Sequence, residues 1–266
     1  MDFVFYFSFG WFISYVKKIW CDWMRKIINK KGEITTKQIV VLIVLIASFA
    51  VILFLLFRLN LGAETDKEIC HNSVILKSKG KGLVGGLDCK TGYVCISGGG
   101  ECEGINPTET INVDAEDKNE IMKAIADEMA DCWWMFGEGE QGYLGTDLQG
   151  DHCAICSIVG FDNSINSEFP EITYEEFYNY LLETKKGISQ SYLKYLYDVF
   201  DVESVKNLNT KMDIDEGKIF TDDKFATITG INPNWPRTDR IVYPYFIKYD
   251  EVSEKTSCDV FDITKS

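Results

Sequence analysis

Histidine is almost absent from this chain of 266 residues, which leaves few candidates for several kinds of catalytic site. The two histidines, His71 and His152, each adjoin a cysteine. A Ser-His-acid or Cys-His hydrolase needs a histidine as its base. The sequence contains no G-x-S-x-G, H-E-x-x-H or Walker motif. It therefore shows no evident catalytic activity, and it predicts no cofactor and no metal site.

Basic residues are also scarce, with 27 lysines and arginines against 41 aspartates and glutamates. One long apolar run, Ile39 to Phe57, separates a basic flank from an acidic remainder. As a helix this run would be about 29 Å long, close to the hydrocarbon thickness of a bilayer. Its single polar residue, Ser48, can hydrogen-bond to its own helix. We predict a single-pass transmembrane helix over residues 38–58 that contacts the lipid bilayer through residues 39–57.

The charges on either side of the apolar run predict its orientation. Seven lysines and arginines precede it, and positive charge beside a span stays in the cytoplasm. Residues 1–37 are therefore expected to be a cytoplasmic or interfacial segment. Residues 59–266 are expected to form one extracellular domain, joined to the membrane by a connector over residues 60–69. This domain carries 19 basic and 38 acidic residues, a net charge of −19, which argues against any nucleic acid partner.

Eight of the nine cysteines follow the apolar run. An even number of cysteines in an exported domain indicates a disulfide framework, although the sequence does not determine the connectivity. We expect Cys132 to be a natural partner for Cys153 or Cys156, and Cys258 to tie the C-terminal part to an earlier cysteine. The expected disulfide cysteines are Cys70, Cys89, Cys95, Cys102, Cys132, Cys153, Cys156 and Cys258.

Apolar periodicity predicts a disulfide-stapled α+β fold for the extracellular domain. The clearest helix is expected over residues 117–136, because apolar side chains recur there every four residues from Ile121 to Trp133. A capping box at Thr173 and Glu176 predicts a helix to residue 184. A further helix is expected over residues 191–200.

Strands are expected where β-branched and aromatic residues alternate between turn residues. Pro244 indicates that its strand is an edge strand or has a bulge. The triplet Gly98 to Gly100 could cradle an anion through its N–H groups, but a turn closed by a disulfide between Cys95 and Cys102 is the favoured interpretation. The expected strands cover residues 73–76, 93–97, 157–161, 225–229, 241–249 and 259–263.

The end of the helix over residues 117–136 supplies the candidate binding residues. Trp133 and Trp134 precede a glycine-rich loop that contains Glu138 and Glu140. Burial in the core is the favoured interpretation of the two tryptophans. In the alternative, these four residues form a binding surface for a sugar or a protein partner, with Trp134 pointing away from the apolar stripe.

Residues 151–156, Asp-His-Cys-Ala-Ile-Cys, form the most chemically suggestive motif. Cys153 and Cys156, beside His152, have the spacing of a redox dithiol or of half a zinc site. No second Cys-x-x-Cys offers further ligands, and the residues that follow suggest a strand. Structural disulfides to other cysteines are favoured, and redox chemistry is an alternative. The acidic run at residues 213–217 lacks EF-hand spacing and is interpreted as a solvated turn.

From Met24 the chain reads MRKIINKKGEITTKQ and then enters the apolar run. This basic leader ending in Lys-Gly resembles the processing signal of archaeal type IV pilin-like proteins. The resemblance implies cleavage after Gly32, so that a filament subunit would begin at Glu33. The segment departs from that family at Lys37, where pilins often carry glutamate. A plain anchor with its N-terminus in the cytoplasm is favoured, and the start at Met1 or Met24 stays open.

Further stretches beginning at Glu68, Leu87, Ala130 and His152, among them Asp-Cys-Trp-Trp-Met-Phe-Gly-Glu-Gly, form a second pattern. They resemble a group of uncharacterised, membrane-anchored ectodomain proteins of small-genome archaea, which implies this topology and no activity. We therefore expect a protein of the cell surface or envelope that binds or assembles with a protein, a glycan or itself. The alternatives are the pilin-like filament subunit and a surface thiol–disulfide redox protein.

Overall fold

The computed structural model describes residues 41–49, 62–80, 87–140, 142–143, 152–209, 217–231, 241–256 and 258–260. The chain divides into two units, Met1–Asn60 and Leu61–Ser266, which are described separately. In the first unit, residues 41–49 are helical and all their side chains are exposed.

Several of the expected segments lie outside the described residues. They are residues 1–37 with the cleavage site at Gly32, the remainder of the predicted transmembrane segment, and residues 213–216 of the acidic run. Within the part of the chain that the structure describes, no helix combines the length and the apolarity needed to cross a membrane.

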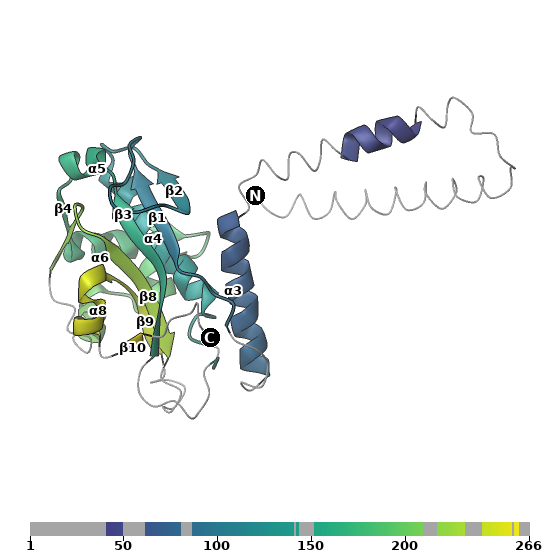
Figure 1. Cartoon of the computed structure of the whole chain (residues 1–266). Coiled ribbons are helices and arrows are strands. Elements are labelled where there is room, and N and C mark those ends of the chain that lie inside the picture. Colours follow the sequence, from purple (N-terminus) through teal and green to yellow (C-terminus); the bar gives the residue numbers. More distant parts are fainter. Residues whose placement is uncertain are drawn as a thin grey trace, which may run out of the picture. The chain divides into compact units, whose positions relative to one another are not determined.

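The second unit is a mixed α+β domain, and Figure 1 labels many of its elements. Its helices are α3 (Gly62–Lys79), α4 (Lys118–Met135), α5 (Asn163–Glu168), α6 (Tyr174–Glu183), α7 (Tyr192–Tyr197), α8 (Val202–Asn209), the 3-10 helix η2 (Tyr249–Glu251) and α9 (Val252–Lys255). Its strands are β1 (Gly92–Ser97), β2 (Glu109–Asn112), β3 (His152–Phe161), β4 (Glu171–Thr173), β5 (Lys185–Lys186), β6 (Gln190–Ser191), β7 (Lys218–Phe220), β8 (Phe225–Ile231), β9 (Ile241–Lys248) and β10 (Asp259–Val260).

The main sheet has the strand order β2-β1-β3-β8-β9, and β10 pairs with the start of β3. Strand β1 is parallel to β2 and β3, whereas β8 is antiparallel to β3 and β9. The pairing of β8 with β9 shifts register between Ile228 and Gly230, opposite the stretch of β9 that contains Pro244. Proline lacks the N–H group that a ladder needs, and its expected place at an edge strand and a bulge is confirmed.

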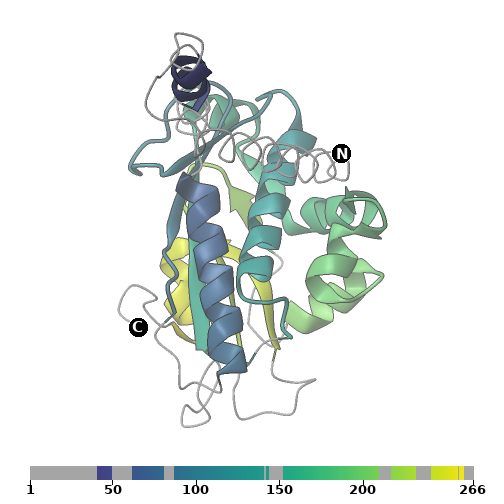
Figure 2. The same ribbon diagram turned by 90° about the vertical axis from the view of Figure 1, so that its right-hand side faces the viewer.

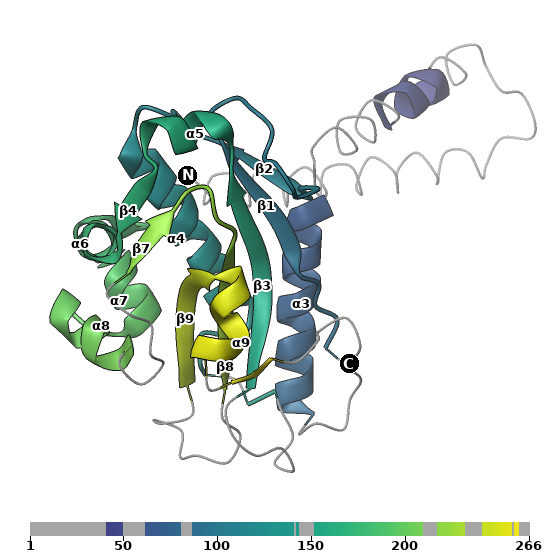
Figure 3. The ribbon, with the colours of Figure 1, turned by 60° about the vertical axis from the view of Figure 1, so that its left-hand side comes forward.

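Helix α4 covers one face of this sheet and α9 lies on the other (Figure 3). Asp117 caps α4, and Ile121, Ile125 and Met129 are fully buried against the sheet, which confirms the helix that the apolar periodicity predicts. Figure 2 shows α3 and α4 side by side on the same face, with α6 and α7 on the other side of α4. Helix α4 therefore lies between α3 on one side and α6 and α7 on the other.

Four disulfides join these elements, which confirms the expected framework. Cys132 of α4 is bonded to Cys156 of β3, and Cys258 is bonded to Cys153. The first bond agrees with the expectation that Cys132 pairs with one of Cys153 and Cys156, and the second ties Cys258 to an earlier cysteine, whose identity the sequence left open. The remaining bonds are Cys70–Cys89 and Cys95–Cys102, and the second closes the loop that contains the glycine triplet.

The strand expected over residues 73–76 is wrong, because this segment lies within α3. Most of the connector expected over residues 60–69 is also helical, since α3 begins at Gly62. Cys70 and Val74, four residues apart, are buried, whereas Ile69 and Leu76 are exposed. This spacing is helical, and a short run of apolar residues does not by itself distinguish a strand from a helix.

The helix predicted from the capping box is confirmed as α6, and both hydrogen bonds of the box are present. The helix expected over residues 191–200 is shorter, because α7 ends at Asp198, which has a left-handed backbone with φ of 56°. The chain then starts α8, which sequence analysis missed.

Candidate functional site

Polar and aromatic side chains form a stripe along the side of α4 that does not face the sheet. Asp127, Asp131 and Trp134 are four and three residues apart, and such spacing places them on one side of the helix. Glu138 follows just beyond its C-terminal end. We call these four residues, with the partly exposed Tyr195 and the buried Tyr192 of α7, the acidic–aromatic face.

The turn after α4 fixes the position of Glu138. Gly137, Glu138 and Gly139 all have left-handed backbones, with φ of 76°, 55° and 71°. This conformation costs a residue other than glycine about 1 kcal/mol. The Glu138 N–H donates to the Trp133 carbonyl over 3.0 Å. The exposed Glu138 side chain accepts a hydrogen bond from the Tyr195 hydroxyl at 2.6 Å. The turn therefore places the Glu138 carboxylate next to α7.

A second phenol–carboxylate pair lies next to the first. The Tyr192 hydroxyl donates to Asp127, which also pairs with Lys123 at 2.6 Å. Burial, together with the hydrogen bond to Asp127, raises the pKa of Tyr192 well above its usual range. Burial and the bond to Glu138 do the same to the pKa of Tyr195. Both hydroxyls therefore remain protonated donors that orient the two carboxylates.

Helix α3 lies along the other side of Trp134. The rings of His71 and Trp134 are stacked, with centroids 4.1 Å apart and planes 9° apart. His71 Nδ1 lies 2.7 Å from the Trp134 carbonyl oxygen, so this nitrogen donates a hydrogen bond. The stack holds one face of the indole in a fixed orientation, while Trp134 as a whole stays partly exposed.

Lys67 of α3 joins the same region through three carboxylates. Its Nζ lies 2.8 Å from Asp131, 3.1 Å from Glu128 and 3.3 Å from Glu109. Burial alone would lower the pKa of Lys67, but the fields of Glu128 and Asp131 outweigh burial and raise it. Burial raises the pKa of Glu128, whose side chain is only 4% exposed. The charged lysine therefore ties α3 to α4 and β2.

The structure separates the binding residues expected from sequence. Trp134 and Glu138 lie on the acidic–aromatic face, and Glu140 is exposed in the same turn. Trp133 is only 5% exposed and packs near Tyr243 in the core, which agrees with the favoured interpretation of this residue and places it away from the acidic–aromatic face. Adjacent helical residues point about 100° apart, which explains why two neighbouring tryptophans have different environments. Sequence analysis missed Asp131, although its spacing from Asp127 and Trp134 was a usable signal.

Cys153 and Cys156 do not bond to each other. Cys153 packs in the core cluster that includes Val252, and Cys156 packs in the cluster that includes Cys132. Residues three apart on a strand point to opposite faces, so each sulfur meets a partner on its own side of β3. His152 is 7% exposed in the same strand. Within the described residues, no group of histidine, cysteine and carboxylate side chains is arranged to hold a metal ion.

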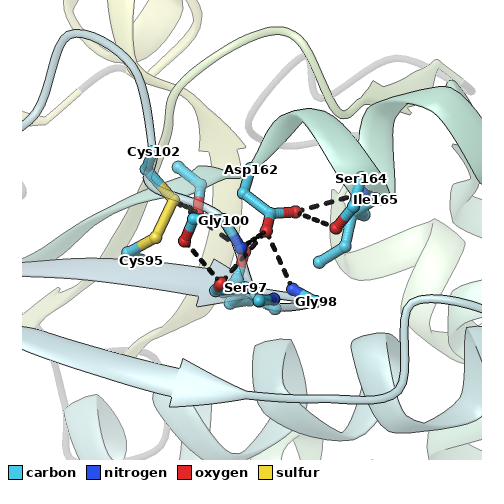
Figure 4. The surroundings of a disulfide bond; sticks show 11 residues. Cys95, Ser97, Gly98, Gly100, Cys102, Asp162, Ser164 and Ile165 are labelled. Atoms are coloured by element: carbon cyan, nitrogen blue, oxygen red, sulfur yellow. Dashed lines mark hydrogen bonds between the residues drawn. A yellow bond between two sulfur atoms is a disulfide. The ribbon is translucent and has the colours of Figure 1, made fainter.

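The glycine triplet does hold an anion, and that anion is the protein's own carboxylate (Figure 4). Asp162 accepts hydrogen bonds from the N–H groups of Gly98 at 3.0 Å and Gly100 at 2.7 Å. It also accepts from Ser164 at 2.7 Å and from the N–H of Ile165 at 3.1 Å. Burial would raise the pKa of Asp162, but these hydrogen bonds lower it. The anion site of the loop is therefore occupied by the fully buried Asp162 side chain, which connects the loop after β1 to the end of β3.

Comparison with protein-family models, curated proteins and solved structures finds no match to this chain. The chemistry of the acidic–aromatic face is therefore the basis on which a function is inferred.

Proposed function

We propose that this chain is a membrane-anchored protein of the cell surface or envelope that binds or assembles with a protein or glycan partner. The observation that carries the proposal is the hydrogen-bonded pair of Tyr195 and the exposed Glu138, beside the side of α4 that carries Asp131 and the partly exposed Trp134. Aromatic rings beside oriented carboxylates suit both sugars and peptide side chains. The anchor and the outward orientation remain proposals from the apolar run and the charge distribution.

The surroundings of this face favour binding because they make it rigid. The Cys132–Cys156 bond fixes α4 to β3, and Lys67 and His71 fix α3 to α4. Binding residues that are already ordered lose less conformational entropy when a partner docks. The redox alternative has less support, since Cys153 and Cys156 belong to two different disulfides.

Binding through this face is testable with two substitutions and one control. Full-length protein in detergent micelles would be applied to arrays of neutral oligosaccharides and synthetic peptides. We expect Trp134→Ala and Glu138→Gln each to weaken binding to the responding probe about tenfold, as loss of a central contact does. Glu140→Gln removes an equal charge from the same turn and should have little effect. If no probe binds, or binding survives both substitutions, the proposal fails.

The intact mass of the protein from native membranes tests the anchor and the cysteine chemistry together. The protein would be weighed with and without alkylation before reduction. We expect no alkylation of the eight cysteines that follow the apolar run, because all eight are in disulfides. Alkylation at Cys153 and Cys156 would instead support the redox alternative. A chain that begins at Glu33 would support the pilin-like alternative.

A further inference from the structure

The two tyrosine rings of the acidic–aromatic face already hold a cation. Lys186 of β5 places its Nζ 5.3 Å from the centre of the Tyr195 ring and 5.7 Å from the centre of the Tyr192 ring. A cation within about 6 Å of an aromatic ring is attracted by the negative face of the ring. Lys186 forms no ion pair with a residue that the structure describes, so its ammonium group is stabilised by the two rings.

The same face carries negative charge that Lys186 does not neutralise. The carboxylate of Glu138 is exposed and accepts from the Tyr195 hydroxyl, but it forms no ion pair within the described part of the chain. The Asp131 side chain remains 41% exposed although it pairs with Lys67. Both carboxylates contribute to the field at Tyr195. The face therefore combines a ring site for a cation with a carboxylate that can still pair with one.

We propose that this face binds a lysine- or arginine-bearing segment of a partner protein, whose cationic side chain takes the place of Lys186 over the partly exposed Tyr195 ring and pairs with Glu138. This inference rests on the proposed function and names its partner. The net charge of −19 after residue 59 attracts a basic segment and repels a second copy of the domain. A guanidinium group also stacks well on aromatic rings and pairs with carboxylates.

Lys186 and Lys185 provide a matched test. A fluorescent nonapeptide of alternating arginine and glycine would be titrated against the full-length protein in zwitterionic micelles, and its anisotropy recorded. Lys186→Ala and Lys185→Ala each remove one positive charge, but only Lys186→Ala vacates the rings. We expect Lys186→Ala to bind the peptide about threefold more tightly than Lys185→Ala, the factor that one exposed cation–π contact supplies. Glu138→Gln should weaken binding, and Glu140→Gln should not.

Each other result would overturn the inference in a recognisable way. Equal affinities of the two lysine variants would show that the rings do not take the peptide. Equal losses for Glu138→Gln and Glu140→Gln would show that the attraction is nonspecific. If a neutral oligosaccharide binds in a Trp134-dependent manner and the peptide does not, the cationic partner is wrong and the proposed function stands. If neither probe binds, both proposals fail.

Discussion

Replacing Asp162 by alanine is expected to lower the free energy of unfolding by about 3 kcal/mol, because one carboxylate joins three segments of the chain. It caps α5 through the N–H of Ile165 and holds the glycine triplet through Gly98 and Gly100. Alanine leaves these donors without their acceptor. Asparagine should recover only part of this loss, since its carbonyl oxygen can replace one carboxylate oxygen while its NH2 group would face N–H donors at the other. Urea unfolding of the full-length protein would measure both variants.

Asp117 is the matched control for this prediction. It also caps a helix, but it is exposed and its side chain accepts from the N–H of Asn119 alone among the described contacts, so Asp117→Ala should cost about 1 kcal/mol. Equal costs for the two alanine variants would contradict the role of Asp162 in the glycine loop.

The contribution of Asp162 to the free energy of unfolding should also depend on pH. Because the pKa of Asp162 is lowered in the folded protein, its contribution is full above the unfolded pKa of about 4 and disappears as the pH falls through the folded value.

The joint between Asp162 and the glycine triplet also shows where sequence reasoning stops. Three consecutive glycines indicate a loop with exposed N–H groups, and an anion at that loop is a sound expectation. The residue that supplies the anion is 62 positions away from Gly100, at the end of a parallel strand that pairs with β1. Only the strand order brings the two together, and no local pattern in the sequence encodes it.

Local sequence patterns predict a helix or strand correctly where the residues of that element alone determine its structure. The apolar residues from Ile121 to Trp133 predict α4 correctly, because a helix that buries one face repeats its apolar side chains every three to four residues. The capping box at Thr173 is equally local. The strand predicted over residues 73–76 is wrong because the burial of this segment depends on a distant helix. Val74 is buried and Leu76 is exposed since α3 packs against α4 on one side only. That contact lies more than forty residues away in the sequence, so it gives no local signal.

The candidate site was predictable only in part for a related reason. Trp134 and Glu138 come from one short segment, and their positions follow from the end of one helix. Tyr192, Tyr195 and Lys186 come from elements about fifty residues later. These residues meet α4 because α6 and α7 pack beside it. Sequence analysis can therefore identify one side of this face but not the residues that complete it.

Removing the Cys153–Cys258 bond is expected to have the largest effect on stability. This bond closes the longest loop in the framework, with a separation of 105 residues. By lowering the entropy of the unfolded chain, a crosslink over such a distance raises the free energy of unfolding by about 5 kcal/mol. The 7-residue separation of Cys95 and Cys102 raises it by only about 2 kcal/mol. Double alanine variants of each pair avoid leaving a reactive thiol. Their urea unfolding in the full-length protein would give the difference directly.

The comparison between the two pairs distinguishes two origins of the stability. If restriction of the unfolded chain dominates, loss of Cys153–Cys258 should cost about twice as much as loss of Cys95–Cys102. If packing in the folded domain dominates, the costs should follow burial. Cys153 and Cys258 pack with Ile228, Val242 and Val252, and Cys95 is also buried, so the two costs would then be similar. Equal costs would contradict the loop-length argument and would place the stabilising role of the framework in the folded state.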